Sequence, residues 1–251
     1  MKIIDVTGSN VEKLGFFCKM SQKKSNGYKR KLEWLKARFD EGMRIKMLDL
    51  SQGGRGFIEY IPGRFAWRAV HAEEYMFIHC IWVVGKSKGN GYAKMLLNES
   101  IKDAEKAGMK GVAMITSEGN WLISKRMLES RGFASVDNAL PSFNLMVKKF
   151  GEAKDPYFPD DWEKRCANFG RGMTVIRTDQ CPYLDDAVNT ASEFADKEGI
   201  KFHSIELNSA EEIRKRVPSP YGVFSIVLDG KLFSYHYLLP REFKPKYDAL
   251  A

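Results

Sequence analysis

The fold is decided by one stretch of sequence, Val83-Val84-Gly85-Lys86-Ser87-Lys88-Gly89-Asn90-Gly91-Tyr92-Ala93. The apolar run that leads into it, residues 75–84, is short, β-branched and aromatic-rich, which predicts a buried strand. The residues that follow carry an apolar stripe at helical spacing and stop at Gly108, which predicts an amphipathic helix. Glycines let backbone N–H groups approach an anion, and a helix N-terminus adds about half a positive charge. The stretch therefore predicts a turn that binds a phosphate group.

The spacing of the glycines separates three phosphate-binding motifs. A dinucleotide-binding fingerprint requires a third glycine at the position of Lys94. A Walker A loop requires its first glycine at the position of Cys80, which lies inside the predicted strand. The pattern that remains is a basic residue, two spacers and Gly-x-Gly, and it runs from Lys86 to Gly91.

This pattern and its flanks resemble the GNAT superfamily of N-acetyltransferases, whose Gln/Arg-x-x-Gly-x-Gly/Ala turn joins the fourth strand to the third helix. Downstream, the sequence predicts a strand at 111–116, a helix at 121–130, and Gly132-Phe133 before a last strand at 142–150. The resemblance covers residues 1–150 and implies that acetyl-CoA is the cofactor. The residues that it assigns to the cofactor are Trp82, Val83, Val84, Lys86, Ser87, Lys88, Gly89, Asn90, Gly91, Tyr92, Ala93 and Asn120.

The N-terminal residues fit the same fold. The predicted elements are a strand at 1–6, helices at 11–18 and 29–39, and strands at 44–50, 55–61 and 75–84. Glycine and proline pairs supply the breaks between these strands. The expected fold class is α/β (α+β), a GNAT fold with a mixed, mostly antiparallel central sheet, followed by a small thioredoxin-like α/β domain.

The resemblance also implies the chemistry, which is direct transfer of an acetyl group from acetyl-CoA to a primary amine in a ternary complex. The backbone N–H of Val83 is the expected oxyanion donor. Three side chains are candidate bases. Tyr75 stands at the spacing of the family's glutamate, with Glu74 beside it, and His79 lies in the same strand and belongs to the residue type that titrates near neutral pH.

The family's general acid is a tyrosine, and this chain has Leu128 at that position. Protonation of the leaving thiolate would then fall to another group, such as Ser124, or to water. The substitution keeps open a non-catalytic acyl-CoA-binding module as an alternative function. The acceptor is expected to be a small-molecule amine or a peptide amine, and the oligomeric state is left open.

A second domain is expected after a connector. Residues 151–172 contain two prolines and no periodicity, and residues 173–251 follow the order β-α-β-α-β-β, with Asp229-Gly230 as the final turn. This order, with Pro218 and Pro220 before the last hairpin, is similar to the thioredoxin fold, which places a cis-proline before its third strand. An acetyltransferase with such a tail resembles proteins with a YoaP-like C-terminal domain.

The second domain departs from the thioredoxin pattern at its cysteines. Redox members carry Cys-x-x-Cys, whereas Cys181-Pro182-Tyr183-Leu184 has a leucine as its last residue, which excludes dithiol exchange. Cys181 beside a helix N-terminus can be a reactive thiolate, alone or paired with Cys166. The other interpretation is a scaffold used for packing or partner binding. A thiol-dependent redox or metal-responsive protein is thus a second alternative function.

Composition narrows the class of protein. The chain has 251 residues, and residues 1–150 hold 26 lysines and arginines against 15 acidic residues, whereas residues 151–251 hold 14 against 17. A basic first domain suits the phosphates of CoA, and the basic cluster at 23–31 comes without any nucleic-acid-binding motif, so nucleic acid is not the expected partner. Four unevenly spaced cysteines give no zinc pattern, and no metal is expected. Without a signal peptide pattern or a long apolar run, we expect a cytoplasmic protein that does not bind membranes.

Overall fold

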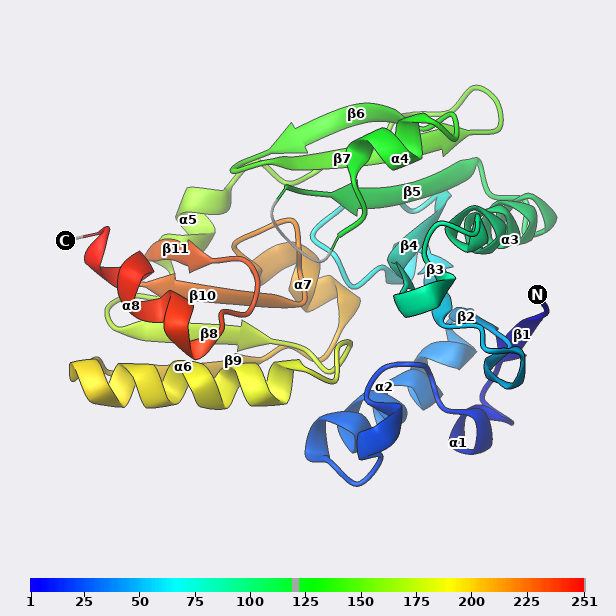
Figure 1. The fold of residues 1–251 in the computed structure, drawn as a ribbon. Helices are drawn as coiled ribbons and strands as arrows, with labels where there is room; N and C mark the ends of the chain where they lie inside the picture. The colour runs from blue at the N-terminus through cyan, green and yellow to red at the C-terminus, as the bar shows by residue number, and fades with distance from the viewer. Residues whose placement is uncertain (119–121, 251) are drawn as a thin grey trace. The chain divides into compact units, whose positions relative to one another are not determined.

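The computed structural model describes residues 1–118 and 122–250 (Figure 1). The chain forms two compact units that both draw on more than one segment of the sequence. The first consists of Met1–Ser21, Leu32–Ala66 and Val70–Phe158, and the second of Gln22–Lys31, Trp67–Ala69 and Pro159–Ala251. Each unit combines helices with a sheet, which confirms the predicted α/β class.

The sheet of the first unit has seven strands in the order β1-β2-β3-β4-β5-β7-β6. Neighbouring strands are antiparallel apart from β4 and β5, which run parallel, so the predicted mixed and mostly antiparallel sheet is confirmed. The bounds are β1 Ile3–Val6, β2 Arg44–Leu48, β3 Gly56–Pro62, β4 Tyr75–Val83, β5 Gly111–Thr116, β6 Ala134–Ala139 and β7 Phe143–Lys149.

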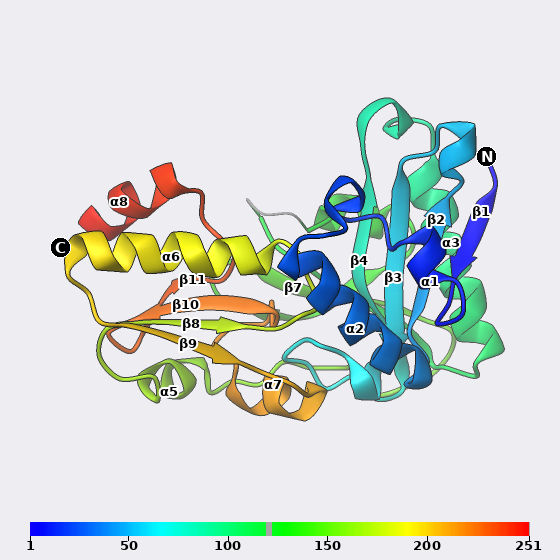
Figure 2. The ribbon, with the colours of Figure 1, turned by 90° about the horizontal axis from the view of Figure 1, so that it is seen from below.

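Helices lie on both faces of this sheet (Figure 2). On one face α3 buries Leu96, Leu97 and Ala104 against strand residues such as Ile78 and Met114. On the other face lie α1 and the part of α2 that belongs to this unit. The helices are α1 Val11–Leu14, α2 Asn26–Asp40, α3 Tyr92–Lys106 and α4 Lys125–Glu129, with 3-10 turns η1 Met20–Gln22, η2 Leu50–Gln52, η3 Gly63–Phe65 and η4 Gly85–Ser87.

The first predicted helix is shorter in the structure than its apolar pattern indicates. We expected it to span residues 11–18, but α1 ends at Leu14. Gly15 follows with φ 75°, and Phe17 and Lys19 also have positive φ values, 78° and 50°. Because L-residues rarely adopt this region, the backbone after Gly15 is a strained loop that apolar periodicity cannot predict.

The end of the first unit differs from the prediction in one strand. Beside the predicted last strand, now β7, lies β6, which the sequence analysis missed because half of its residues are polar and none is buried. The register of β6 shifts between Ser135 and Asp137, as in a β-bulge, and β6 forms an edge of the sheet. The helix expected at 121–130 is described over Lys125–Glu129 only.

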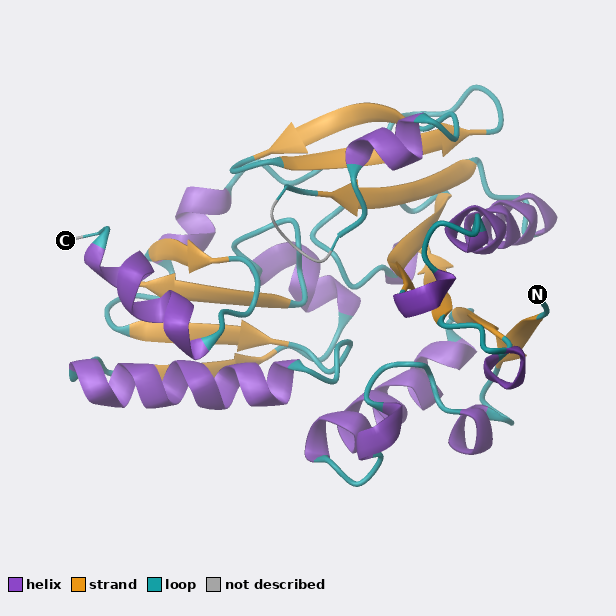
Figure 3. Ribbon diagram, in the orientation of Figure 1, coloured by secondary structure: helices purple, strands orange, loops and turns teal. Residues whose placement is uncertain are grey.

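The second unit has a four-stranded sheet in the order β11-β10-β8-β9. Figure 3 shows strands in orange and helices in purple, in the orientation in which Figure 1 labels them. Strands β8 and β9 are parallel, and β10 is antiparallel to both β8 and β11. Phe194 of α6 packs on Phe243 of α8 with ring centroids 5.0 Å apart. The bounds are β8 Met173–Arg177, β9 Phe202–Glu206, β10 Phe224–Leu228, β11 Lys231–Ser234, α5 Trp162–Ala167, α6 Leu184–Glu198, α7 Ala210–Arg216 and α8 Pro240–Asp248.

Two helices of the second unit were not predicted. Helix α5 lies inside the segment expected to be a connector, and α8 follows the last hairpin. The predicted hairpin turn is confirmed, since Asp229 and Gly230 both have positive φ. The cis peptide bond of the described chain is Leu140–Pro141, so the bonds before Pro218 and Pro220 are trans, unlike the expectation from the thioredoxin resemblance. None of the described helices is both long and apolar enough to cross a membrane.

Candidate functional site: a glycine turn at the end of strand β4

The glycine turn between β4 and α3 has the conformation of an anion cradle. Gly85, Gly89 and Gly91 have φ values of 59°, 80° and 73°, which favour glycine. A Cβ added to any of the three would meet no atom within 4 Å, so these positions need glycine for its backbone freedom, and the space beside them is open. All three glycines are exposed.

Helix α3 begins at this turn with uncapped amides. Gly91 is its N-cap and has no side chain to accept a hydrogen bond, and the first helical bond runs from the N–H of Met95 to the carbonyl of Gly91 at 3.1 Å. The N–H groups of residues 92–94 therefore precede the first intrahelical bond and point out of the helix end. Together with the helix dipole they form the positive end of the cradle.

Two of the predicted cofactor residues hold the turn in place. Ser87 is buried, and its Oγ accepts a hydrogen bond from the N–H of Arg55 at 3.0 Å. The side-chain amide of Asn90 donates to the carbonyls of Lys86 and Lys88 at 2.8 and 3.3 Å. These contacts fix the shape of the turn, and Lys86 and Lys88 are exposed on it.

Strand β4 parts from β5 just before the turn. Their pairing covers Tyr75–Ile78, whereas β4 continues to Val83. At the end of the strand, the N–H of Val84 donates to the carbonyl of Arg55 in the direction of β3, at 2.9 Å. Because successive N–H groups of a strand point to opposite edges, the N–H of Val83 points to the edge where β5 has parted from β4.

His79 lies four residues before Val83 and faces the α2 side of the sheet. It is buried, its Nδ1 is 3.3 Å from Oε1 of Glu59 on β3, and its ring centroid is 6.3 Å from that of Trp34. The register of β3 with β4 shifts between Glu59 and Tyr60, which gives β4 an extra residue beside this pair. Glu59 is a functional candidate that the sequence analysis missed, although a lone carboxylate in the apolar run 56–62 was the available signal.

The other two candidate bases lie at the far end of β4. Tyr75 is the first residue of the strand, about 26 Å from Val83 at about 3.3 Å per residue. Its hydroxyl donates to the carbonyl of Lys154 at 2.7 Å, and burial raises the pKa of this phenol. Glu74 is exposed beside it. The structure therefore separates both residues from the glycine turn.

The remaining first-domain candidates divide into four cases. Asn120 lies outside the described residues. Leu128, at the position where the resemblance implies a tyrosine acid, is fully buried in the core and offers no proton. Ser124 precedes α4 and is exposed. Trp82, Tyr92 and Ala93 are half-buried beside the turn.

Two segments from earlier in the sequence, Gln22–Lys31 and Trp67–Ala69, contact the Cys181 loop within the second unit. A Cβ added to Gly27 would lie 2.1 Å from the carbonyl oxygen of Pro182, so the backbones of the two residues are in close contact. The guanidinium of Arg68 bonds the carbonyl of Trp67 at 2.7 Å and the side-chain oxygen of Gln180. Cys181 itself is half-buried and precedes α6, which begins at Leu184.

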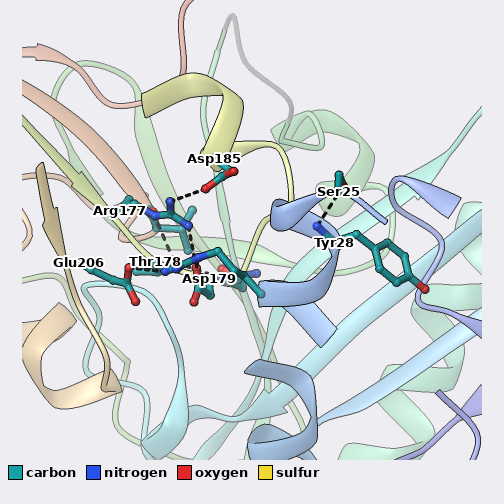
Figure 4. A network of polar contacts seen from close by, with 10 residues as sticks. Ser25, Tyr28, Arg177, Thr178, Asp179, Asp185 and Glu206 are labelled. Atoms are coloured by element: carbon teal, nitrogen blue, oxygen red, sulfur yellow. Dashed lines mark hydrogen bonds and ion pairs between the residues drawn. The ribbon is translucent and has the colours of Figure 1, made fainter. Parts of the chain in front are cut away.

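A network of ion pairs fixes this loop (Figure 4). Arg177 donates to Asp179 at 2.7 Å and to Asp185 at 3.0 Å. Arg30 donates to the same oxygen of Asp179 at 2.8 Å and also contacts Glu206. The four cysteines of the chain form no disulfide with one another, and burial raises the pKa of the Cys166 thiol. Within the described residues no group of three or more metal-binding side chains occurs.

Comparison with known proteins places the chain in a family. It is 34% identical over 255 residues to an uncharacterized N-acetyltransferase, YoaP of Bacillus subtilis (strain 168), and the match covers all of both chains. Residues 17–133, which include the glycine turn, match the Acetyltransferase (GNAT) family. The chain belongs to the GNAT acetyltransferase family.

Two solved structures similar to this GNAT chain each cover 60% of it. A GNAT-family acetyltransferase from Staphylococcus aureus Mu50 is 17% identical, with a TM-score of 0.44 over 60% of this chain and 99% of that one. The PaiA N-acetyltransferase from Thermoplasma acidophilum, in complex with coenzyme A, is 18% identical, with a TM-score of 0.41 over 60% of this chain and 100% of the other.

Proposed function

We propose that this GNAT chain transfers an acetyl group from acetyl-CoA to a primary amine by direct attack in a ternary complex. The observation that carries the proposal is the glycine turn, where three positive-φ glycines and the uncapped start of α3 direct N–H groups to an open, exposed surface. Lys86 and Lys88 are exposed on the same turn and would pair with the cofactor's phosphates.

In this mechanism the amine nitrogen attacks the thioester carbonyl carbon. The new C–N bond forms as the carbonyl π electrons move to oxygen, and the N–H of Val83 is the donor to that oxyanion. Such a donor contributes about 2.7–4 kcal/mol in other acyl-transfer enzymes. The C–S bond then breaks, the thiolate of CoA leaves, and water supplies its proton, since Leu128 occupies the position of the family's acid.

The amine must lose a proton, and His79 is the proposed acceptor. Its contact with Glu59 would hold the ring in one orientation and stabilise the imidazolium, as a carboxylate does in other histidine-dependent sites. Because the pair is buried, the proton would reach it through water.

The second unit is proposed to have a thioredoxin-like fold that serves as a scaffold. Its sheet order, with β8 parallel to β9 and antiparallel to β10, supports the fold proposal. The close approach of Gly27 to Pro182 and the contact of Arg68 with Gln180 support packing as the role of the loop, rather than thiol exchange at Cys181.

Acetyl-CoA binding by calorimetry tests the cradle. Gly89→Glu places a negative charge beside the phosphates and is expected to abolish binding. Gly108→Glu is the matched control, because Gly108 also has positive φ with open space, but it follows the other end of α3. Equal binding by both variants would overturn the acetyltransferase proposal.

A CoA-release assay with a panel of amines separates the enzyme from a non-catalytic acyl-CoA-binding module. The missing tyrosine favours the module as the second candidate. Binding of acetyl-CoA without release of CoA in the presence of any amine would support the module and contradict the transfer mechanism.

A further inference from the structure

The first unit contains a hollow that the cofactor cradle does not use. It holds about 320 Å³, within the range of ligand pockets. Its lining is mostly apolar and comes from the loop after α1, from η1, from η2 and from the turn before β3. The lining residues are Phe17, Met20, Leu50, Gly53, Gly54 and Arg55.

Hydrogen bonds join this hollow to the cofactor turn. The carbonyl of Arg55 accepts from the N–H of Val84, and the N–H of Arg55 donates to Ser87 Oγ. The next residue, Gly56, pairs with Val83. The lining segment of the hollow therefore runs beside the end of β4, the strand that carries the proposed oxyanion donor.

An aromatic wall extends from the hollow over the sheet. Phe17 stacks on Phe57 with ring centroids 5.0 Å apart and meets Trp82 edge-on at 6.2 Å. Phe17 holds this place with φ 78°, a strained conformation of the kind that clusters at ligand sites. Leu50, the first residue of η2, also lines the hollow, and 43% of its surface is exposed. The hollow thus offers an apolar surface whose Phe17 contacts Trp82, the residue before the proposed oxyanion donor.

One charge distinguishes the hollow from a purely apolar pocket. Arg55 is the charged member of the six lining residues, and it is exposed. Across residues 1–118 and 122–250 its guanidinium has no ion pair, whereas its backbone is fully engaged. A guanidinium fork at the rim attracts a carboxylate and repels a ligand that carries only positive charge.

We propose that this hollow is the acceptor site and that its substrate is an amine with an apolar or aromatic body and a carboxylate, which Arg55 binds. The assignment rests on the acetyltransferase function proposed above. It excludes polycationic amines as the preferred acceptors, because they would bring further positive charge to Arg55.

Matched acceptors test the carboxylate. L-phenylalanine, L-phenylalanine amide and L-alanine are compared by chromatographic detection of CoA release. We expect kcat/KM for phenylalanine to exceed that for the amide about tenfold or more, as for one charge-assisted hydrogen bond. Phenylalanine should also exceed alanine, because alanine leaves the aromatic wall uncovered. Equal or greater turnover of the amide would overturn the proposal.

A variant pair assigns the effect to Arg55. Arg55→Gln should lose the preference for the carboxylate while the Kd of acetyl-CoA stays unchanged, and Lys13→Gln, an exposed cation elsewhere in the unit, should change neither. A weaker acetyl-CoA Kd with the preference intact would place Arg55 at the cofactor and contradict the proposal.

Binding of the product gives a readout that needs no turnover. With CoA present, N-acetyl-L-phenylalanine should bind the wild-type protein and should bind Arg55→Gln about tenfold more weakly. Absence of both turnover and product binding would overturn the acceptor proposal alone. The proposed function is tested separately. It is overturned if Gly89→Glu and Gly108→Glu bind acetyl-CoA equally well.

Discussion

Glu59 is the residue whose position in the fold most needs a functional explanation. A carboxylate in the middle of an apolar strand, almost fully buried and in contact with His79, is costly unless it is paired. Nothing about cofactor binding requires it, since the cradle lies beyond the end of β4. Its position on the α2 face, the face that also carries Phe57, connects it with the proposed acceptor.

Glu59→Gln is predicted to lower kcat about 10²–10⁴-fold, the usual contribution of general base catalysis, with the Kd of acetyl-CoA unchanged. His79→Gln should have a similar effect, and the double variant should be no worse than the worse single one, because the two act as a unit. Activity profiles over pH provide the check. A purely structural pair would lower thermal stability without changing the shape of the profile.

Asp103 gives the first unit a pH-dependent contribution to stability. Burial acts to raise its pKa, but the hydrogen bond from Tyr60 at 2.6 Å and the charges of Lys46 and Arg44 outweigh burial, so the pKa is lowered. A lowered folded-state pKa stabilises the protein above the unfolded value, about 3.9, and this stability is lost as the pH falls below it.

Asp103→Asn is therefore predicted to lower the free energy of unfolding at pH 7 by about 1.5–3 kcal/mol. The difference from wild type should shrink as the pH falls below about 4. Urea unfolding at several pH values measures this. Glu105→Gln, on the exposed side of the same helix, should be neutral throughout, and a constant deficit of Asp103→Asn at all pH values would contradict the assignment.

At the scale of elements, the start of α2 and the Cys181 loop form one packed structure in the second unit. Gly27→Ala is predicted to destabilise the protein by about 1–3 kcal/mol, because the new Cβ would lie 2.1 Å from the carbonyl oxygen of Pro182. Thermal unfolding followed by circular dichroism measures the loss. Gly8→Ala is the control, since its Cβ would find ordinary contact with Phe39 at 3.6 Å. An unchanged midpoint for Gly27→Ala would contradict this packing.

The elements also show what sequence can predict. Strands β4 and β5 are apolar runs and helix α3 carries an apolar stripe at helical spacing, and their predicted positions are confirmed. The polar edge strand β6 and the short helix α5 lack that periodicity and were missed.

The candidate site was predictable only where it depends on local sequence. The turn with its positive-φ glycines and the helix that begins at Gly91 follow from the local sequence and are confirmed, whereas cofactor binding at this turn stays a prediction. The contact of Glu59 with His79, and the hollow beside Arg55, join residues from separate strands and loops, which no local pattern contains.

At the scale of the whole molecule, the excess positive charge of residues 1–150 should make acetyl-CoA binding salt-dependent. Exposed ion pairs contribute about 0.2–1 kcal/mol each, so Lys86→Gln with Lys88→Gln should weaken binding about two- to thirtyfold and flatten the salt dependence. Lys106→Gln with Lys110→Gln, at the other end of α3, should leave both unchanged. If the Lys86→Gln, Lys88→Gln double variant kept the salt dependence of the wild-type protein, that result would contradict phosphate contacts at these lysines.

The bulged, polar strand β6 has a consequence for the behaviour of the protein at high concentration. An open sheet edge offers unpaired N–H and C=O groups to any neighbour, and a flat apolar edge invites strand addition and aggregation. Here the edge is interrupted between Ser135 and Asp137 and carries exposed polar side chains, with the Asp137 carboxylate accepting from the N–H of Phe158 at 2.7 Å. Concentrated samples should therefore resist amyloid-like growth from this side, and replacing Asp137 and Asn138 by valine would remove that protection.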